Sequence, residues 1–497
     1  MSTNGATPPR SIAVVGGGFG GVGAVTMLRR AGYDEVTVFE KGDRVGGVWH
    51  HNTYPGAACD VPSHLYEFSF APNPRWSRRY APGPEIQAYL EDVARRHGVL
   101  DRIKTNTEVE RASWDEGRAK WVLQTSSGEH EADVLVTACG QLSVPSVPPL
   151  PGLDSFEGPA FHTAEWRHDV DLTGKRVALI GTGCSAIQSG PAIQPTVSRL
   201  DVYQRSPGWT LPKLDFAYSE RAQRLFEHFP ALQRLDRAAI YGFMETATAA
   251  MTSRRWLMPP FRAVGRSQIN RAIKDPELRR KVTPTDEMGC KRIMLTDEWY
   301  PMLTRPNVEV VTDRIAEISP TGIRTADGSE RPADAIVLAT GFKSHAFVAP
   351  LEIEGEGGRT LADAWSEVAR AYLGLSVPSF PNMFLLYGPN TNGGAGSVIF
   401  TLESGIGHVI AALTELDSRG ANRIEVRRET AAAFDRALRA ALSRSVWHTG
   451  CTSWYVDDKG NDPSQWPWLC TTHRRRTAQL EPGAYELSEA ARAPVAS

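Results

Sequence analysis

Apolar and polar positions along the chain predict a strand–turn–helix–strand unit that occurs twice. Near the start, the β-branched run from Ile12 to Val15 is typical of a buried strand, and VGAVTMLRRAG has the spacing of a helix that ends at Gly32. Val36 to Phe39 follows as a second strand. The same pattern returns in KRVALIGTGCSAIQSGPAI and RLDVYQR. Two nucleotide-binding folds in tandem would explain such a repeat.

The segments that follow the two units also correspond. WVLQTSSGEHEADVLVTACG and GIRTADGSERPADAIVLATGF each contain short alternating strands that close in an apolar strand and a glycine. Between the halves, the proline-rich GQLSVPSVPPLPG is expected to be a linker. ETAAAFDRALRAALSRSVW predicts a helix that packs onto the first fold, and the tail after about Leu487 is expected to fray.

We therefore expect an α/β fold with two tandem Rossmann-like dinucleotide-binding domains and a helical insertion in the second. The insertion is predicted where Arg, Ala, Leu and Phe recur at helical spacing. The expected boundaries are 1–145 and 345–497 for the two parts of the first domain, 150–212 and 286–344 for the two parts of the second, and 213–285 for the insertion.

Composition and charge narrow the possible partners. The chain has 497 residues, 41% of them apolar and 23% charged, and its net charge of −2 gives no global basic field for nucleic acid. The first ten residues lack the apolar core of a signal peptide, and no segment reaches about 18 uninterrupted apolar residues. We expect a cytoplasmic protein without a nucleic-acid or membrane partner, and the sequence leaves the oligomeric state open.

Cysteine spacing and one histidine-rich stretch bear on possible metal or redox chemistry. The six cysteines, at positions 59, 139, 184, 290, 451 and 470, form no CxxC pair, which argues against a disulfide scaffold, a zinc ribbon or a dithiol centre and favours reduced thiols. WHHNTYPGAACD combines two histidines with Cys59 and Asp60, which are possible metal ligands. The adjacent histidines project differently and Cys59 has no nearby partner, so no metal site is expected.

The first glycine turn has the dinucleotide fingerprint Gly16-x-Gly18-x-x-Gly21. These glycines allow a tight turn, close approach of a pyrophosphate to backbone amides, and packing of the helix on the strand. Glu40 ends the next strand, 24 residues after Gly16, where a carboxylate accepts hydrogen bonds from a ribose 2′-hydroxyl.

The second turn is Gly181-x-Gly183-x-x-Ala186, a permitted variant of the fingerprint. Its next strand ends in Gln204-Arg205-Ser206, and an arginine at this place can bind a 2′-phosphate with two hydrogen bonds. The pair of sites predicts FAD in the first fold and NADPH in the second, with hydride passing from NADPH to the flavin. Without a CxxC pair, the final acceptor is expected to be oxygen, a quinone or another protein.

Two longer motifs carry a family resemblance. GGVWHHNTYPGAACD has the fixed positions Gly46, Gly47, Trp49, Tyr54, Pro55, Gly56 and Asp60, and FEGPAFHTAEWR has Phe156, Gly158, His162 and Trp166. They resemble the signatures of the Baeyer–Villiger monooxygenases, class B flavoprotein monooxygenases, and the resemblance extends from about residue 10 to 485. Arg167 departs from the second signature, which has proline or aspartate there. We expect His162 and Trp166 to lie in the interdomain linker and to couple domain movement rather than transfer protons.

The resemblance implies an FAD-dependent, NADPH-consuming enzyme that inserts one oxygen atom from O2 beside a ketone carbonyl, through a C4a-peroxyflavin, to give an ester or lactone. It implies that Arg292 stabilises the anionic peroxyflavin, that Asp60 orients Arg292, and that Lys291 joins Arg205 at the NADP 2′-phosphate. LYGPNTN precedes an apolar helix whose N-terminus is expected to face the flavin. The other expected cofactor contacts are Phe19, Gly47, Trp49, Tyr66 and Val109 in the first half and Thr182, Ser185 and Ser206 in the second.

Two alternatives remain at this point. The same cofactors could serve N- or S-oxygenation of amines, hydroxylamines or thioethers, which the short chain and the context CKRIMLTDEWYPML favour. A nucleotide-binding redox sensor or scaffold without turnover is the other alternative, and an intact Arg292 and Asp60 argue against it. The ketone is not specified by the sequence, and its pocket is expected mostly from the helical insertion and the loops near Trp209 and GGAGSVIF.

Overall fold

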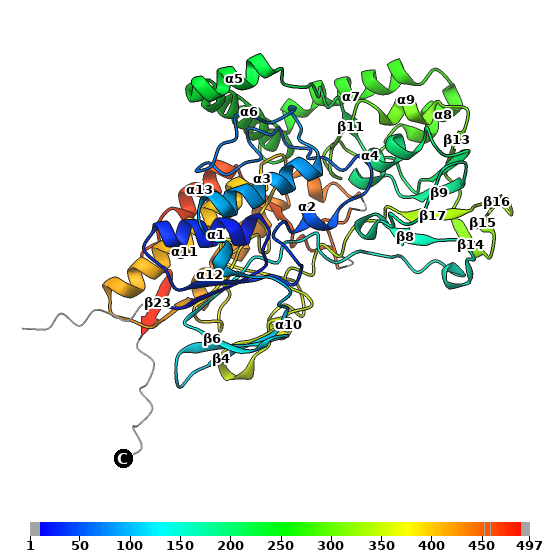
Figure 1. The fold of residues 1–497 in the computed structure, drawn as a ribbon. Coiled ribbons are helices and arrows are strands. Elements are labelled where there is room, and N and C mark those ends of the chain that lie inside the picture. Colours follow the sequence, from blue (N-terminus) through cyan, green and yellow to red (C-terminus); the bar gives the residue numbers. More distant parts are fainter. Residues whose placement is uncertain (1–9, 452, 458, 489–497) are drawn as a thin grey trace, which may run out of the picture.

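Each of the two repeated units forms a five-stranded parallel sheet (Figure 1). The computed structural model describes residues 10–451, 453–457 and 459–488. The strands of the first sheet, in spatial order, are β19 (Met383–Leu385), β7 (Val134–Thr137), β1 (Ile12–Val15), β2 (Val36–Phe39) and β3 (Ile103–Lys104). Every residue of β1 and β7 is buried, which explains why continuous apolar runs mark these strands in the sequence.

The second sheet repeats this arrangement. Its strands, in spatial order, are β8 (Ala160–His162), β17 (Ala335–Leu338), β9 (Arg176–Ile180), β10 (Arg199–Tyr203) and β13 (Val308–Val311). The last four take the places of β7, β1, β2 and β3 in the first sheet, and all are parallel. The predicted α/β fold with two tandem Rossmann-like domains is therefore confirmed.

The alternating segments of the sequence form smaller sheets beside each large one. In the first half, β4 (Val109–Asp115), β5 (Lys120–Thr125) and β6 (Gly128–Ala132) are antiparallel, and β18 (Glu352–Glu354) joins them along β4. In the second half, β14 (Ile315–Ser319), β15 (Gly322–Thr325) and β16 (Glu330–Pro332) form the equivalent antiparallel sheet. Each group leads directly into the strand, β7 or β17, that adjoins the glycine turn.

Helices complete the first domain. Helix α1 (Phe19–Arg30) packs beside α11 (Val398–Ser418), and α13 (Cys470–Thr477) packs against α11 in turn. Within the part of the chain that the structure describes, α11 is the one helix long and apolar enough to cross a membrane, but 67% of its apolar window is buried inside the molecule. It is therefore a core helix of this domain. The helix predicted near the C-terminus is α12 (Arg428–Leu442).

The predicted helical insertion consists of α5 (Glu220–His228), α6 (Pro230–Met251), α7 (Met258–Ala272) and α8 (Pro276–Val282), drawn in green in Figure 1. Helix α6 docks on the first domain through apolar side chains such as Ile240 and Met244, which join its core cluster, and through polar side chains. Gln233 donates to the buried carboxylate of Glu67 at 3.0 Å, and Asp236 contacts the buried His64 at 2.8 Å. Their spacing along the helix places both on one face.

Two expectations from the sequence are wrong. His162 ends the edge strand β8 of the second sheet, so the second family motif belongs to a domain and not to the linker. A strand of three residues next to a proline-rich stretch gives too little pattern to be recognised. Cys290 and Cys451 form a disulfide, so the thiols are not all reduced. Most of the tail expected to fray after Leu487 lies outside the described residues.

Candidate active site

A cavity of about 1350 Å³ lies between the two glycine turns. It exceeds the usual range of about 300–1,000 Å³ for a small-ligand pocket, so it has room for more than one ligand. Its lining includes, from the first half, the sequence-predicted residues Gly16, Gly18, Phe19, Glu40, Gly47, Trp49, Asp60, Tyr66 and Val109. From the second half it includes Gly181, Thr182, Gly183, Ser185, Arg205, Ser206, Lys291 and Arg292.

Six predicted residues lie outside this lining. They are Gly21, Ala186 and the motif residues Phe156, Gly158, His162 and Trp166. The role of Gly21 is packing, because a Cβ there would lie 1.9 Å from the carbonyl oxygen of Gly16. The substrate pocket was expected mostly from the insertion and the loops near Trp209 and GGAGSVIF. Gly208, Gly393 and Gly396 of those loops line this cavity, whereas the insertion, 213–285, contributes no residue to the described lining.

The first glycine turn has the shape that a dinucleotide requires. Gly16 has φ +109°, and a Cβ there would lie 2.5 Å from the carbonyl oxygen of Ala138, so only glycine fits. At Gly18 the nearest atom to an added Cβ is the Cα of Gly47, at 3.4 Å, so two glycines face each other across the turn. Side-chain-free backbone at this place leaves room for a pyrophosphate.

Glu40 is held beside this turn. Its carboxylate accepts hydrogen bonds from the amides of Gly17 and Gly42, both at 2.6 Å. Glu40 lines the cavity although it is buried, which fixes a negative charge where a ribose would lie. The donor set and shape of the first half thus fit FAD.

The second turn repeats the geometry of the first. Gly181 has φ +115°, and a Cβ added there would lie 2.3 Å from the carbonyl oxygen of Ala339. A Cβ at Gly16 would meet the carbonyl oxygen of Ala138 in the same way. Nothing lies within 4 Å of a Cβ added at Gly183, so the cradle is open on that side. This correspondence supports a second dinucleotide site at the start of α4 (Cys184–Ile193).

Two cations lie beside the second turn. Arg205 is exposed, and Lys291 donates to the hydroxyl of Ser206 at 3.0 Å. Lys291 also pairs with Asp286 at 2.5 Å, which holds the ammonium group close to the end of β10. An arginine, a lysine and a hydroxyl in this arrangement fit a 2′-phosphate, and hence NADP rather than NAD.

Arg292 and Asp60 form an ion pair that joins the two halves of the molecule. Nη2 of Arg292 lies 2.5 Å and Nε 3.1 Å from the same carboxylate oxygen of Asp60. Burial by itself would raise the pKa of Asp60, but the charge and hydrogen bonds of Arg292 outweigh it and hold the pKa below its usual value. The charge of Asp60 in turn raises the pKa of Arg292 well above its ordinary value. The pair therefore presents a permanent cation in the cavity.

Aromatic side chains form one wall near this pair. The indole of Trp49 donates to the hydroxyl of Tyr66 at 3.1 Å, and the two rings meet edge to face. Phe19 contacts Tyr66 from the other side, with ring centroids 5.3 Å apart. Burial raises the pKa of Tyr66 well above its ordinary value, so this phenol stays protonated.

The stretch WHHNTYPGAACD crosses between the domains. Gln188 of α4 accepts a hydrogen bond from the hydroxyl of Tyr54 at 2.8 Å and donates to the carbonyl of Ala58 at 2.9 Å. Gly56 has φ +82°, and a Cβ there would lie 2.5 Å from the backbone oxygen of Gln188. The glycine of the motif is therefore required by close contact with the second domain, and Gln188 is an interface residue that the sequence analysis missed.

His50 and Cys59 of this stretch have other surroundings. His50 pairs with Asp43 at 2.9 Å, and Cys59 is buried in the core of the first domain. Within the described ranges, no three His, Cys, Asp or Glu side chains lie together in a way that could hold a metal ion.

The second motif supports the edge of the second domain. Nδ1 of the buried His162 accepts a hydrogen bond from the amide of Ala164 at 3.1 Å, and burial lowers the pKa of this histidine. A Cβ at Gly158 would lie 2.5 Å from the carbonyl oxygen of Asp334. Trp166 packs edge to face on Phe161. These residues support β8 and the short helix η3 (Thr163–Glu165) after it, from which Ala164 and Glu165 line the cavity.

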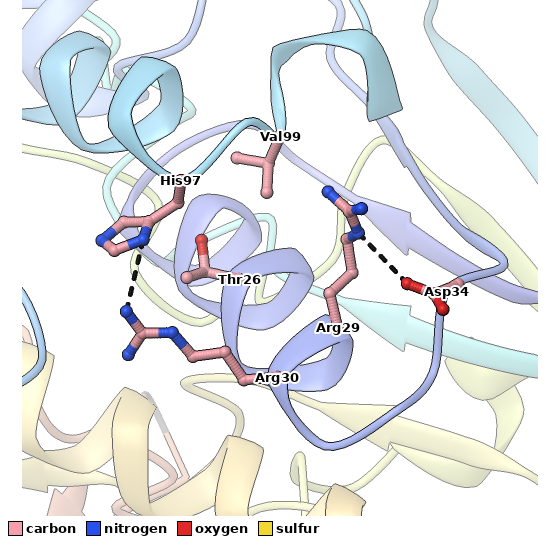
Figure 2. Close-up of a pocket in the computed structure, with 6 residues that line it drawn as sticks. All are labelled: Thr26, Arg29, Arg30, Asp34, His97 and Val99. Carbon is pink, nitrogen blue, oxygen red and sulfur yellow. Dashed lines mark hydrogen bonds and ion pairs between the residues drawn. The ribbon is translucent and has the colours of Figure 1, made fainter.

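A second, smaller hollow of about 210 Å³ lies at the far end of α1 (Figure 2). Its arginines already have partners: Arg29 pairs with Asp34 and donates to the carbonyl of Gly98, and Arg30 lies 3.2 Å from a ring nitrogen of His97. A helix of this length separates it from the glycine turn by about 18 Å. It is therefore distinct from the cofactor cavity.

Comparison with known proteins gives consistent results. Residues 13–227 match a family model described as pyridine nucleotide-disulphide oxidoreductase. A Baeyer–Villiger monooxygenase of Streptomyces coelicolor is 41% identical over 97% of this chain and 94% of its own. A solved structure of oxidised steroid monooxygenase bound to NADP is 34% identical, with a TM-score of 0.87 over 97% of this chain and 99% of that one. OTEMO in complex with FAD and NADP is 25% identical, with a TM-score of 0.87 over 97% of this chain and 100% of that one.

Proposed function

The chain belongs to the Baeyer–Villiger monooxygenase family, NADPH-dependent flavoproteins that use FAD, and we propose that it inserts one atom of O2 beside the carbonyl of an apolar ketone to give an ester or lactone. The observation that carries this proposal is the Arg292–Asp60 ion pair, which lies in one cavity between two dinucleotide turns. The relatives do not favour the alternative of N- or S-oxygenation.

The first half of the cavity would hold FAD. The turn from Gly16 to Gly21 would receive the pyrophosphate and Glu40 the ribose, while Trp49 and Tyr66 would pack near the ring system. The N-terminus of α11 also opens on the cavity through Val398 and Thr401, where its dipole favours negative charge. When bound and reduced by NADPH, FAD supplies the activated oxygen.

The second half would hold NADPH. The turn at Gly181 would receive its pyrophosphate, and Arg205, Ser206 and Lys291 its 2′-phosphate. These groups lie on the second domain, whereas Asp60 and Trp49 lie on the first, so the reacting part of the coenzyme would be directed toward the domain interface. By holding NADP there, these residues would also help to exclude water from the site.

Arg292 would be the electrophilic group of the reaction. Its guanidinium is positively charged at any working pH, and negative charge develops on oxygen when a nucleophile adds to a carbonyl. Asp60 accepts two of its N–H bonds, so the arginine is fixed before the substrate arrives. Asp60 is a positioning residue in this scheme, and its lowered pKa keeps it ionised for that role.

The domain boundaries and the cellular location belong to the same proposal. We place the domain boundaries at 1–145, 150–212, 213–285, 286–344 and 345–497, which is supported by the membership of the strands in the two sheets. We also propose a cytoplasmic location, for which the burial of α11 inside the molecule removes the one described candidate for a membrane-spanning helix.

Product analysis with labelled oxygen tests the function. The FAD-loaded enzyme is incubated with NADPH, ¹⁸O2 and a panel of ketones, amines and sulfides. We expect an ester or lactone that contains one ¹⁸O atom, and we expect Arg292→Ala to abolish it while NADPH still bleaches the flavin. Only N-oxides or sulfoxides, or wild-type ester formation by Arg292→Ala, would contradict the proposal.

A further inference from the structure

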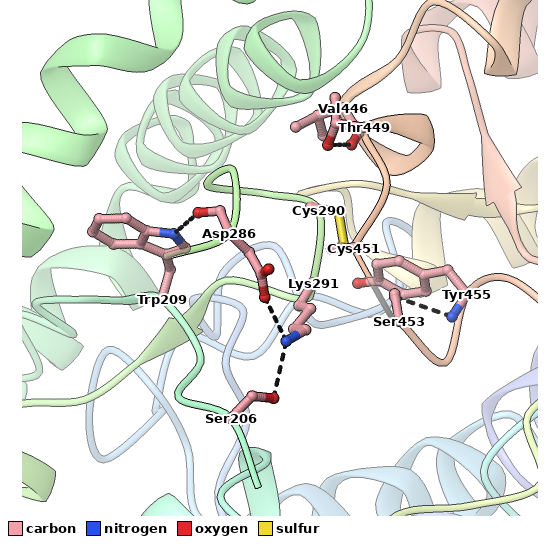
Figure 3. Close-up of a disulfide and its surroundings, with 10 residues drawn as sticks. All are labelled: Ser206, Trp209, Asp286, Cys290, Lys291, Val446, Thr449, Cys451, Ser453 and Tyr455. Atoms are coloured by element: carbon pink, nitrogen blue, oxygen red, sulfur yellow. Dashed lines mark hydrogen bonds and ion pairs between the residues drawn. A yellow bond between two sulfur atoms is a disulfide. The ribbon is translucent and has the colours of Figure 1, made fainter. Parts of the chain in front are cut away.

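The loop that carries Lys291 and Arg292 is covalently linked to a distant part of the chain. Cys290, which directly precedes Lys291, forms a disulfide with Cys451, 161 residues further on (Figure 3). Their Cα atoms lie 6.3 Å apart, within the range that such bonds span. Cys290 is fully buried, whereas Cys451 is half-buried.

The partner segment belongs to the same cavity. Cys451 follows the short helix η6 (Val446–His448), and Ser453 and Trp454 beyond it line the cofactor cavity. Tyr455 is buried near Arg292, whose charge acts on this phenol. The disulfide therefore connects the cationic loop of the second domain to a wall of the cavity that the C-terminal part of the chain provides.

The loop is otherwise held by single polar contacts and by packing. On the side of the second domain, Trp209 donates to the carbonyl of Asp286 at 2.8 Å, and the carboxylate of Asp286 holds Lys291. Gly289 has φ +93° and abuts Met251 of α6. On the side of the first domain, the Arg292–Asp60 pair and the disulfide provide the polar and covalent links, and the buried Met288 packs in the same apolar cluster as Val446. Breaking the disulfide leaves the ion pair to hold Arg292 in the cavity without a covalent restraint.

We propose that Cys290 and Cys451 are positioning residues that form a redox-controlled tether: the disulfide holds Lys291 and Arg292 in the cavity, and its reduction uncouples NADPH oxidation from oxygen insertion. The proposal rests on the function assigned above to Arg292. When the tether is open, Arg292 samples positions away from Asp60, and reducing equivalents from NADPH leave as hydrogen peroxide instead of oxygenated product.

The chemistry of the switch is ordinary thiol–disulfide exchange. A dithiol attacks Sγ of the accessible Cys451, the Cys290 thiolate leaves, and the second thiol of the reductant displaces the thiolate of Cys451. The protein gains two electrons and two protons, and the reductant becomes a cyclic disulfide. Two protein thiols and one hydrogen peroxide regenerate the disulfide and release two water molecules. The peroxide of uncoupled turnover is thus an oxidant that closes the tether again.

Thiol mapping of the FAD-loaded enzyme tests the bond directly. After equilibration with hydrogen peroxide at a low, stoichiometric level and removal of the excess, the protein is denatured and alkylated. We expect four of the six cysteines to react and a linked peptide pair containing Cys290 and Cys451; treatment with dithiothreitol should raise the number to six. Six reactive thiols in the oxidised sample would overturn the proposal.

Coupling efficiency tests the function of the bond. We expect reduced wild-type enzyme to release at least threefold more hydrogen peroxide per NADPH than oxidised enzyme, with an unchanged rate of flavin reduction at saturating NADPH. The double variant Cys290→Ser/Cys451→Ser is the matched control: it should behave like reduced wild type and should not respond to dithiothreitol. If the double variant does not fold, the comparison of oxidised and reduced wild type still tests whether the disulfide controls coupling.

Equal peroxide yields from the oxidised and reduced enzyme would overturn the tether. Failure of the proposed function gives a different result, because the oxidised enzyme would then form no oxygenated product from any ketone. The thiol map and the yield of peroxide per NADPH do not depend on ester formation, so the two failures can be told apart.

Discussion

At the scale of single residues, coenzyme choice depends on cations at the end of one strand. Arg205 follows β10 and is exposed on the cavity, and Lys291 reaches the neighbouring Ser206 from a loop 85 residues further along the chain. NADH has a hydroxyl where NADPH has a 2′-phosphate, so these cations act on NADPH selectively.

We expect Arg205→Ala to raise the KM for NADPH by about tenfold to a hundredfold and to leave the KM for NADH nearly unchanged, since a charge-assisted hydrogen bond contributes roughly 1.5–3 kcal/mol. Steady-state kinetics with both coenzymes measure this effect. Arg255→Ala, at an exposed arginine of the insertion, is the matched control and should change neither KM. An equal loss for both coenzymes would contradict the 2′-phosphate assignment.

The residues that could be found from the sequence are those fixed by local geometry. Gly16 and Gly181 are recognisable because a turn between a buried strand and a helix needs glycine there, and Glu40 and Arg205 lie at a fixed distance from it. Asp60 was predicted from a family motif and Arg292 from the family resemblance, and their ion pair spans 232 residues of sequence. Gln188 has no such local signal, because its partners lie 130 residues away on another domain.

At the scale of elements, the loop from Tyr54 to Ala58 and helix α4 form a closely packed contact between the domains. The loop from Tyr54 to Ala58 is held by hydrogen bonds to Gln188, and Gly56 touches the backbone of α4. This loop leads directly to Asp60. Displacement of the loop would therefore also move the partner of Arg292.

We expect Gly56→Ala to destabilise the protein by about 1–3 kcal/mol, because a Cβ would meet the helix backbone and the residue has positive φ. Thermal unfolding would show a lower Tm, and peroxide release per NADPH would increase. Gly242→Ala on α6 is the control: a Cβ meets no atom within 4 Å there, and alanine favours the helix. Equal stability of Gly56→Ala and wild type would contradict the close contact between this loop and α4.

Some strands and helices were predicted from the sequence and others were not. The buried strands β1 and β9 carry continuous apolar runs and the insertion helix α6 carries a helical pattern, and all three were predicted. β8 was not, because its three residues pair at the edge of a sheet with β17, which lies far along the chain. The Cys290–Cys451 bond was missed for the same physical reason, since only the folded chain brings these residues together.

At the scale of the whole molecule, the chain passes through the second domain and returns to the first. β19, from residues 383–385, completes the sheet that β1 began, and α11 then packs beside α1. The cavity lies between these two domains and is lined by both. A ligand in it contacts segments from the beginning, middle and end of the chain, so its binding should stabilise the whole molecule.

Removal of FAD should therefore lower the Tm. A ligand at a hundred times its Kd stabilises the folded state by about 2.7 kcal/mol, which corresponds to roughly 3–4 °C for a folding unit of about 300–500 residues. Differential scanning calorimetry of apo and FAD-loaded protein measures the shift in Tm, and NADP⁺ should raise the Tm further.

Two variants separate the two sites. Arg205→Ala should keep the rise in Tm with FAD and lose most of the rise with NADP⁺. Gly16→Val should lose the rise with FAD, because its side chain would occupy the turn. If both ligands left the Tm unchanged, the cavity between the two turns would not be their binding site.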